Sequence, residues 1–170
     1  MIDAAGRDAL IDEAAQIWAE ATAARDGHDQ VPALDVSRPV IQGVLDRSPR
    51  ALLLIARSAD GTAAGFAAIE PAPGSNDTTA RVSYIGVRPV LQGQGTGATL
   101  LLKTLQRLKA AGYASVELSA YVDNHKATAL YQRLGWQPVG LPAPHPKTGK
   151  PEQRYALHLS DQPRAPGPEG

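Results

Sequence analysis

The chain has 170 residues, with 17 basic and 17 acidic side chains and no cysteine. This length predicts a single domain, and a formal charge of zero provides no overall field that would attract nucleic acid, an anionic membrane or an acidic partner. The absence of cysteine excludes disulfide bonds, thiolate metal sites and a cysteine nucleophile.

Further absences narrow the class of protein. The four histidines show neither HxxxH nor HExxH spacing, so we expect no metal. The longest apolar run, residues 51–56, is far shorter than a membrane span, and the first residues contain no hydrophobic export segment. These patterns predict a cytoplasmic protein without a membrane contact.

The N-terminal part of the chain predicts two helices. Apolar residues at helical spacing indicate a first helix over about residues 7–24 and a shorter second helix over about residues 36–47. We expect Ser37 or Asp35 to cap the second helix and Pro39 to lie in its first turn.

Three strands are predicted next. Residues 51–56 have the pattern of a buried strand, and Asp60-Gly61 favours a two-residue turn into a second, antiparallel strand over residues 62–70. A glycine-rich loop over residues 71–78 then leads to a third strand that ends at Val87.

The remaining elements alternate between helix and strand. A leucine-rich helix ends at Gly112, which is a typical residue after a helix C-terminus. Then follow a strand over residues 115–121, a helix over residues 124–134, and two strands over residues 136–140 and 153–159. A proline-rich loop over residues 141–151 separates the last two strands, and we expect a disordered tail over residues 162–170. The order of elements predicts one α+β domain over residues 1–161 with a mixed sheet.

A glycine-rich segment joins the third strand to the leucine-rich helix. After Val87 the chain reads Arg88-Pro89-Val90-Leu91 and then Gln92-Gly93-Gln94-Gly95-Thr96-Gly97. Alternate glycines allow a tight turn and close approach of a ligand, and the start of a helix presents unpaired N–H groups. The segment is either a plain strand-to-helix turn or, as we favour, a site for a phosphate or diphosphate.

One alternative for this segment is a dinucleotide site. Gly93-x-Gly95-x-x-Ala98 satisfies a loose dinucleotide fingerprint, and Glu117 lies at about the distance of a ribose-binding acid. Four residues, including Pro89, separate the strand from the glycines, and too little chain remains for a second half of a doubly wound sheet. A dinucleotide-dependent oxidoreductase is therefore the less favoured alternative.

Two separate stretches resemble the GCN5-related N-acetyltransferase (GNAT) family. The segment from Val87 to Gly97 is similar to its V-x-P…[RQ]-x-x-G-x-[GA] signature. Downstream, Asn124-x-x-Ala127-x-x-Leu130-Tyr131-x-x-x-Gly135-Trp136 is similar to N-x-x-A-x-x-L-Y-x-x-x-G-F, with Trp in place of Phe. The motifs follow in the right order, separated by one helix and one strand, and the likeness covers nearly the whole chain. The family's first strand is short or missing before Arg7.

The resemblance implies a fold and an activity. The fold is a central, mostly antiparallel mixed sheet of about six to seven strands with about four helices. The activity is transfer of an acetyl group from acetyl-CoA, as co-substrate, to a primary amine of a small molecule or peptide by direct attack in a ternary complex. A non-catalytic acyl-CoA-binding sensor on the same fold is the alternative. We expect a monomer or homodimer, with residues 26–35 and 141–151 framing the acceptor cleft.

The resemblance also implies a set of donor-binding residues. Backbone amides of the glycine segment would hold the diphosphate, and the preceding strand would offer backbone groups to the pantetheine arm. The residues expected to bind the donor are Ile85, Gly86, Val87, Gln92, Gly93, Gln94, Gly95, Thr96, Gly97, Ala98, Asn124 and Tyr131.

Two residues are expected to act in catalysis. Tyr131 would protonate the leaving thiolate, because a phenol of pKa about 10 and a thiol of pKa about 8.5 exchange a proton through one hydrogen bond. Histone-type members of the family carry a glutamate where this chain has Arg81. Glu70 is the substitute that we expect to serve as base, with Tyr84 and Glu117 behind it.

Overall fold

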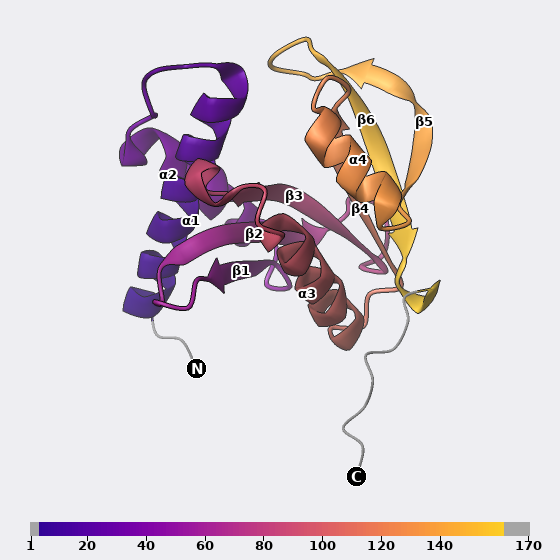
Figure 1. The fold of residues 1–170 in the computed structure, drawn as a ribbon. Coiled ribbons are helices and arrows are strands. Elements are labelled where there is room, and N and C mark those ends of the chain that lie inside the picture. Colours follow the sequence, from indigo (N-terminus) through magenta and orange to yellow (C-terminus); the bar gives the residue numbers. More distant parts are fainter. Residues whose placement is uncertain (1–3, 162–170) are drawn as a thin grey trace.

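The computed structural model describes residues 4–161, and this range contains four α-helices and one six-stranded sheet (Figure 1). The predicted disordered tail over residues 162–170 lies outside the described residues. The elements are α1 (Ala4–Asp26), α2 (Leu34–Asp46), β1 (Leu52–Arg57), β2 (Ala63–Pro71), β3 (Thr79–Val87), the 3-10 turn η1 (Pro89–Leu91), α3 (Thr96–Ala110), β4 (Ser115–Tyr121), α4 (His125–Arg133), β5 (Gln137–Pro144), β6 (Pro151–His158) and the 3-10 turn η2 (Leu159–Asp161).

The strands form one mixed sheet in the order β1-β2-β3-β4-β6-β5. All neighbouring strands are antiparallel except β3 and β4, which run parallel and are joined by the crossover helix α3. A parallel pair needs such a long connection. The structure confirms the predicted α+β class, with six strands and four helices in the part that it describes.

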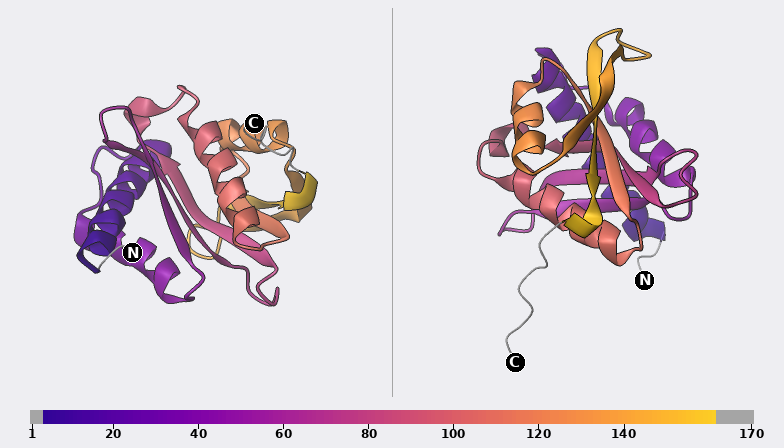
Figure 2. Two further views of the ribbon diagram at one scale, coloured as in Figure 1. Left: turned by 90° about the horizontal axis from the view of Figure 1, so that it is seen from below. Right: turned by 90° about the vertical axis from the view of Figure 1, so that its right-hand side faces the viewer.

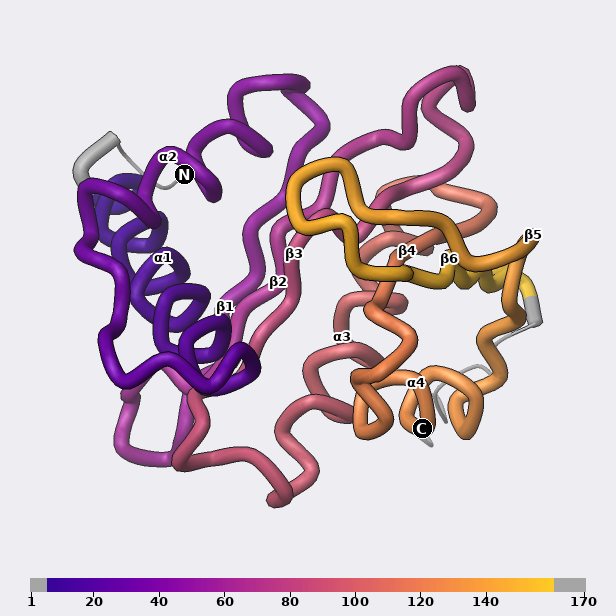
Figure 3. The backbone as a smooth tube through the Cα atoms, turned by 90° about the horizontal axis from the view of Figure 1, so that it is seen from above, coloured from indigo at the N-terminus to yellow at the C-terminus, as the bar shows by residue number. Residues whose placement is uncertain are grey.

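The sheet divides where its two parallel strands separate. Strands β3 and β4 pair only from Thr79 and Ser115 to Arg81 and Glu117. Beyond that point β3 stays paired with β2, and β4 stays paired with β6. Two three-stranded leaves therefore diverge, as Figures 1 and 3 show from two directions. We call this divergence the fork; it lies between residues 82–87 of β3 and residues 118–121 of β4.

Helices cover both faces of the sheet (Figure 2). Helices α1 and α2 pack on one face and α3 and α4 on the other, with a separate apolar core on each side. Strand β2 contributes to both cores because successive side chains of a strand point to opposite faces. Phe66 and Ala68 belong to the α1–α2 core, whereas Ala67 and Ile69 belong to the α3–α4 core.

Helix α3 is attached to its core by the predicted leucine stripe. Leu101, Leu105 and Leu108 are all buried, and they recur at the spacing that keeps side chains on one side of a helix. The helix stops at Ala110, and Gly112 takes a φ of +91°, as expected for a glycine after a helix C-terminus. The stripe thereby fixes where the helix begins relative to the fork.

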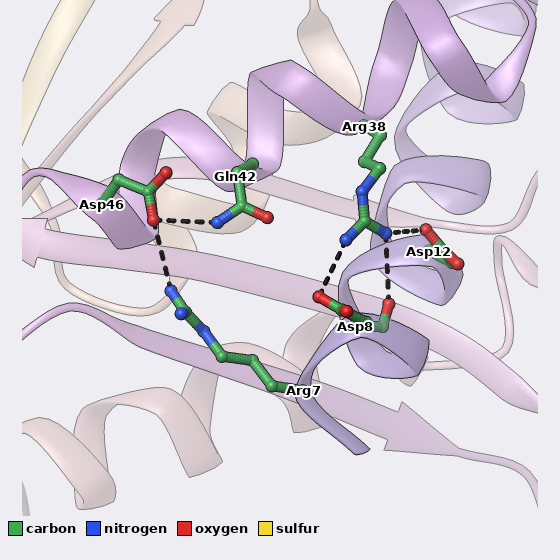
Figure 4. A network of polar contacts seen from close by, with 6 residues as sticks. All are labelled: Arg7, Asp8, Asp12, Arg38, Gln42 and Asp46. Carbon is green, nitrogen blue, oxygen red and sulfur yellow. Dashed lines mark hydrogen bonds and ion pairs between the residues drawn. The ribbon is translucent and has the colours of Figure 1, made fainter. Parts of the chain in front are cut away.

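Charged side chains join α1 to α2 on the other face (Figure 4). Arg38 on α2 pairs with Asp8 at 2.9 Å and also with Asp12 on α1. Arg7 pairs with Asp46 at 3.4 Å, and Gln42 donates to the same carboxylate at 2.8 Å. These exposed contacts orient the helix pair more than they stabilise it, because solvent screens such ion pairs.

Helix α2 begins differently from the prediction. Its N-cap is Ala33, which offers no side-chain bond, so the predicted caps Ser37 and Asp35 are wrong. Ser37 is buried inside the helix and donates to the Ala33 carbonyl at 3.3 Å. Pro39 lies within the helix and not in its first turn. Tertiary packing sets this boundary and overrides the local preference for a cap.

The first hairpin is antiparallel as predicted, but two details were wrong. Strand β1 is half-buried because it lies at the edge of the sheet, where one side of its backbone has no neighbouring strand among the described residues. The turn is not the two residues Asp60-Gly61. It runs from Ser58 to Gly61, closed by a 2.9 Å bond from the Gly61 N–H to the Ser58 carbonyl, and β2 begins at Ala63.

The predicted loop over residues 141–151 is partly strand, because residues 141–144 belong to β5 and residue 151 to β6. Strand β5 continues to Pro144 and β6 begins at Pro151, with a register shift between Val139 and Ala143. Prolines cannot donate to a central ladder, but β5 is the other edge of the sheet and tolerates them. Only residues 145–150 connect the two strands.

Two absences apply to the described range alone. Within residues 4–161 no strand precedes α1, in line with the family's first strand being short or missing there. None of the helices described has the length and apolar content that crossing a bilayer requires.

Replacing Leu101 by alanine is expected to lower the free energy of unfolding by about 2–5 kcal/mol, because the side chain is fully buried and leaves a cavity. Its neighbour Leu102 is 43% exposed, so Leu102→Ala is the matched control and changes stability by less than about 0.5 kcal/mol. Urea unfolding followed by circular dichroism measures both. Equal losses in the two variants would contradict the assigned face of α3.

Candidate active site at the fork

The glycine segment turns the chain from β3 into α3. Gly93 and Gly95 have φ values of +81° and +80°, in the left-handed region that costs other residues strain. Gly95 is also the N-cap of α3. Two of the three alternate glycines are therefore required by backbone conformation.

A row of free backbone donors follows from this turn. Thr99 is the first residue of α3 whose N–H bonds to a carbonyl, that of Gly95 at 3.1 Å. Within the described residues the N–H groups of residues 93–98 donate no hydrogen bond. Free donors at the positive end of a 15-residue helix form an environment that suits a phosphate or diphosphate.

Residues before the glycines hold the segment in place. The Arg88 guanidinium donates to the Ala63 carbonyl at 2.7 Å and pairs with Glu20 of α1 at 3.2 Å. The Gln92 side chain donates to the Val87 carbonyl at 3.2 Å, so the chain doubles back on the end of β3. Gln92 therefore stabilises the turn through its side chain, and this role is separate from its predicted role in binding the donor.

The two sequence motifs meet at Gly97. A methyl group at this position would lie 3.8 Å from Val87 Cγ2 and 3.9 Å from Leu130 Cδ2. The end of β3, the start of α3 and the middle of α4 therefore converge at the fork. Ile85 packs against the α3–α4 core. Gly86 has a packing reason of its own, since a methyl group there would lie 3.0 Å from Phe66 Cε1.

Asn124 is the N-cap of α4, and this structural role is compatible with ligand binding. Its Oδ1 accepts from the Ala127 N–H at 3.3 Å. Its Nδ2 group donates to nothing in the described part of the chain, so it is available to a carbonyl of a ligand. The motif asparagine thus has a defined orientation before any ligand binds.

Tyr131 lies in the apolar core beneath α4. Its ring centroid is 6.0 Å from that of Trp136 and 5.8 Å from that of Tyr155, and the residue is only 7% exposed. Burial, with a smaller contribution from Tyr155, raises the pKa of Tyr131 to about 12. The phenol therefore stays protonated at neutral pH and can act only as a hydrogen-bond donor or acid.

A row of alternating charges crosses the sheet at the base of the fork. Arg47 pairs with Glu70 at 2.7 Å, Glu70 lies opposite Arg81 in the strand register, and Arg81 pairs with Glu117 at 3.0 Å. Glu117 is at the last β3–β4 pair, whereas Glu70 is one strand further away. The third candidate base, Tyr84, packs edge-on against Trp18 of α1 at 6.2 Å.

A second cluster surrounds Tyr121 at the far end of β4. The Arg25 guanidinium of α1 lies 5.0 Å from its ring centroid, and His145 of the β5–β6 connection packs at 5.7 Å. The Tyr121 hydroxyl lies 3.2 Å from Thr148 Oγ1. The end of α1 and the β5–β6 connection, both next to the predicted acceptor loops, thus meet at one strand end. Nothing in the sequence pattern links these residues, because the contacts join distant segments.

No metal centre accompanies these groups. In residues 4–161 no three histidine, aspartate or glutamate side chains gather as metal ligands would.

The family model for the acetyltransferase (GNAT) family matches residues 11–136. The chain belongs to this family. The sheet agrees with that assignment and not with the dinucleotide-dependent oxidoreductase, because its strands are mostly antiparallel and not doubly wound and parallel. That alternative is wrong.

Curated relatives match part of this GNAT chain. The mycothiol acetyltransferase of Clavibacter michiganensis subsp. michiganensis is 40% identical over 91 residues, which are 54% of this chain and 28% of the relative. The mycothiol acetyltransferase of Paenarthrobacter aurescens is 35% identical over 85 residues, which are 49% of this chain and 26% of the relative. The matched segment thus spans less than a third of the length of these relatives.

Solved GNAT structures share the whole fold. The ribosomal-protein-S18-alanine N-acetyltransferase from Escherichia coli has a TM-score of 0.67 at 24% identity, covering 91% of this chain and 90% of that one. The yncA protein from Salmonella typhimurium, solved with its cofactor acetyl-CoA, has a TM-score of 0.67 at 19% identity and covers 94% of both chains.

The buried phenol predicts a pH dependence of stability. The pKa of Tyr131 is about 12 in the folded chain against 10.0 for an unperturbed tyrosine, so its contribution is complete below pH 10 and is lost between about pH 10 and 12. At about pH 11 the wild type loses about 1 kcal/mol that Tyr131→Phe retains. Urea unfolding of both proteins at about pH 8 and about pH 11 measures the difference. Identical losses would show that the phenol ionises freely in the folded state.

Proposed function

We propose that this GNAT protein transfers an acetyl group from acetyl-CoA to a primary amine of a small molecule or peptide, by direct attack in a ternary complex. The observation that carries the proposal is the row of free N–H groups of residues 93–98 at the fork. Family membership, the similarity to mycothiol acetyltransferases and the acetyl-CoA in a structure of the same fold support it.

The donor would be held at three places. The amides of residues 93–98 bind its diphosphate. The pantetheine arm lies along residues 85–87, where β3 has lost its partner β4 and can accept a short extended ligand. Asn124 Nδ2 donates to an amide carbonyl of the arm. The acetyl end then lies between the two leaves.

The reaction removes one proton from the amine and supplies one proton to the leaving thiolate. The amine nitrogen attacks the thioester carbon, the C–S bond breaks, and the thiolate leaves with the bonding electron pair. With a pKa of about 12, Tyr131 lies about 3.5 pKa units above an ordinary thiol, so complete transfer costs about 5 kcal/mol. Tyr131 therefore acts first as a hydrogen-bond donor to the departing sulfur. The proton lost by the amine finally protonates this sulfur.

Glu70 is our proposed base. An amine of pKa about 10.4 loses its proton at a cost of about 5 kcal/mol at pH 7, and a carboxylate beside the nitrogen can accept that proton as the C–N bond forms. The carboxylate of Glu70 is 9% exposed and bound to Arg47, whose own side chain is 57% exposed and free to move. Glu117 is its competitor, because it lies at the fork itself.

A non-catalytic acyl-CoA sensor is the second candidate function. The observation in its favour is that arginines hold both carboxylates, Glu70 through Arg47 and Glu117 through Arg81. The proposal also includes a cytoplasmic location and a monomer or homodimer. It includes no nucleic-acid or membrane partner, and the zero formal charge supports this last part.

Titration calorimetry with acetyl-CoA tests donor binding, and thiol release against a panel of amines tests turnover. We expect Tyr131→Phe to bind acetyl-CoA like the wild type and to lower kcat by about 100-fold. Tyr155→Phe is the matched control, since it removes a hydroxyl from the neighbouring ring, and its kcat should stay near that of the wild type. Binding without thiol release from any amine would favour the sensor, and absence of binding would overturn both functions.

Glu70→Gln is expected to lower kcat/KM by about 100-fold near pH 7, because an amide cannot accept the proton of the amine. The variant leaves no buried charge unpaired, because Arg47 is more than half exposed. Glu117→Gln is the comparison. A wild-type kcat/KM in Glu70→Gln together with a large loss of kcat/KM in Glu117→Gln would transfer the role of base to Glu117.

A further inference from the structure

The neutral chain distributes its charges unevenly between the two faces of the sheet. Helices α1 and α2 contain seven acidic and three basic residues. Helices α3 and α4 contain no acidic residue and five basic ones, namely Lys103, Arg107, Lys109, Lys126 and Arg133. The face that holds the glycine segment is therefore the positive face.

The cations of the positive face are also unpaired. Nine of the ten ion pairs in residues 4–161 use an arginine outside α3 and α4, and the tenth uses Lys150. Within that range none of the five cations on α3 and α4 forms an ion pair or a side-chain hydrogen bond. Cations that the protein does not neutralise are available to an anionic ligand.

Two of these cations line a cavity that continues from the glycine segment. The cavity has a volume of about 450 Å³ and lies between β1 and α3. Gln94, Gly95 and Thr96 line it beside the free amides, and Lys103 and Arg107 line it further along α3. The Cα–Cβ bonds of a helix tilt toward its N-terminus, a direction that favours reach of these two side chains toward the glycines.

The opposite wall of the cavity is apolar. It is formed by Leu54 and Ala56 of the edge strand β1, which pack against the α3–α4 core; Ile55 also borders the cavity, but its side chain packs against the α1–α2 core. Arg57 also borders the cavity, but Glu13 holds its guanidinium at 2.8 Å. The cavity thus combines an apolar patch, made by Leu54 and Ala56, with two free cations, which suits an aromatic base that carries a phosphate ester.

We infer that Lys103 and Arg107 bind the 3′-phosphate of the donor's adenosine, with the adenine against β1. The inference rests on the proposed function, since coenzyme A carries this phosphate on the ribose next to its diphosphate. With the diphosphate on the amides of residues 93–98, the ribose phosphate has two unpaired cations within the same cavity. These residues would make the chain select coenzyme A over carriers that lack the 3′-phosphate.

The test compares acetyl-CoA with its 3′-dephospho analogue by titration calorimetry at about 0.05 M and about 0.3 M salt. We expect the wild type to bind acetyl-CoA about tenfold more tightly at low salt, and the preference to shrink at high salt. Lys103→Gln and Arg107→Gln should each reduce the preference by about threefold and leave the affinity for the dephospho analogue unchanged.

Lys109→Gln is the matched control, because it removes the same charge from the same helix outside the cavity. It should retain the wild-type preference. Equal affinity of the wild type for both carriers would overturn the inference and leave the proposed function intact. An equal loss in Lys109→Gln would also overturn it, since the effect would then come from the general field of the helix. Binding of neither carrier would overturn the proposed function itself.

Discussion

At the fork, the backbone groups of β3 and β4 that face each other form no hydrogen bonds between the two strands. Strands β3 and β4 share only the pairs from Thr79 and Ser115 to Arg81 and Glu117, and each then stays with its own leaf. Backbone groups that leave a ladder must find another partner, in water or in a ligand. The free N–H groups of residues 93–98 likewise need hydrogen-bond acceptors, and they lie next to the fork. In the proposed donor complex, one extended ligand that ends in a diphosphate would supply partners to both sets of backbone groups.

The three alternate glycines of the signature serve different purposes. Gly93 and Gly95 are required by the backbone, which takes positive φ at both. Gly97 lies in the first turn of α3, where a methyl group would only touch Val87 and Leu130 at ordinary distances. In the proposed function, the missing side chain of Gly97 would leave room for the donor between β3 and α4. The same motif thus reflects the backbone conformation at Gly93 and Gly95 and the space around the residue at Gly97.

The sequence predicted the elements that carry local signals, and it missed what depends on contacts between distant segments. Gly112, Asn124 and Gly135 mark helix ends, and α3, β4 and α4 lie where expected. The continuation of β5 through its prolines was missed because only the sheet order reveals an edge strand. The raised pKa of Tyr131 and the contact of Arg25 with Tyr121 were also out of reach, since burial and pairing across the sheet have no local pattern.

The separation of charge between the two faces has a practical consequence for handling the protein. At a pI of about 6.9 a uniformly charged molecule would pass through either kind of ion-exchange resin near neutral pH. Here α3 and α4 offer to a sulfonate matrix five cations that form no ion pair within residues 4–161, whereas six of the seven carboxylates of α1 and α2 are paired with arginines. We therefore expect a sulfonate matrix to retain the protein near neutral pH, although the whole chain has no net formal charge.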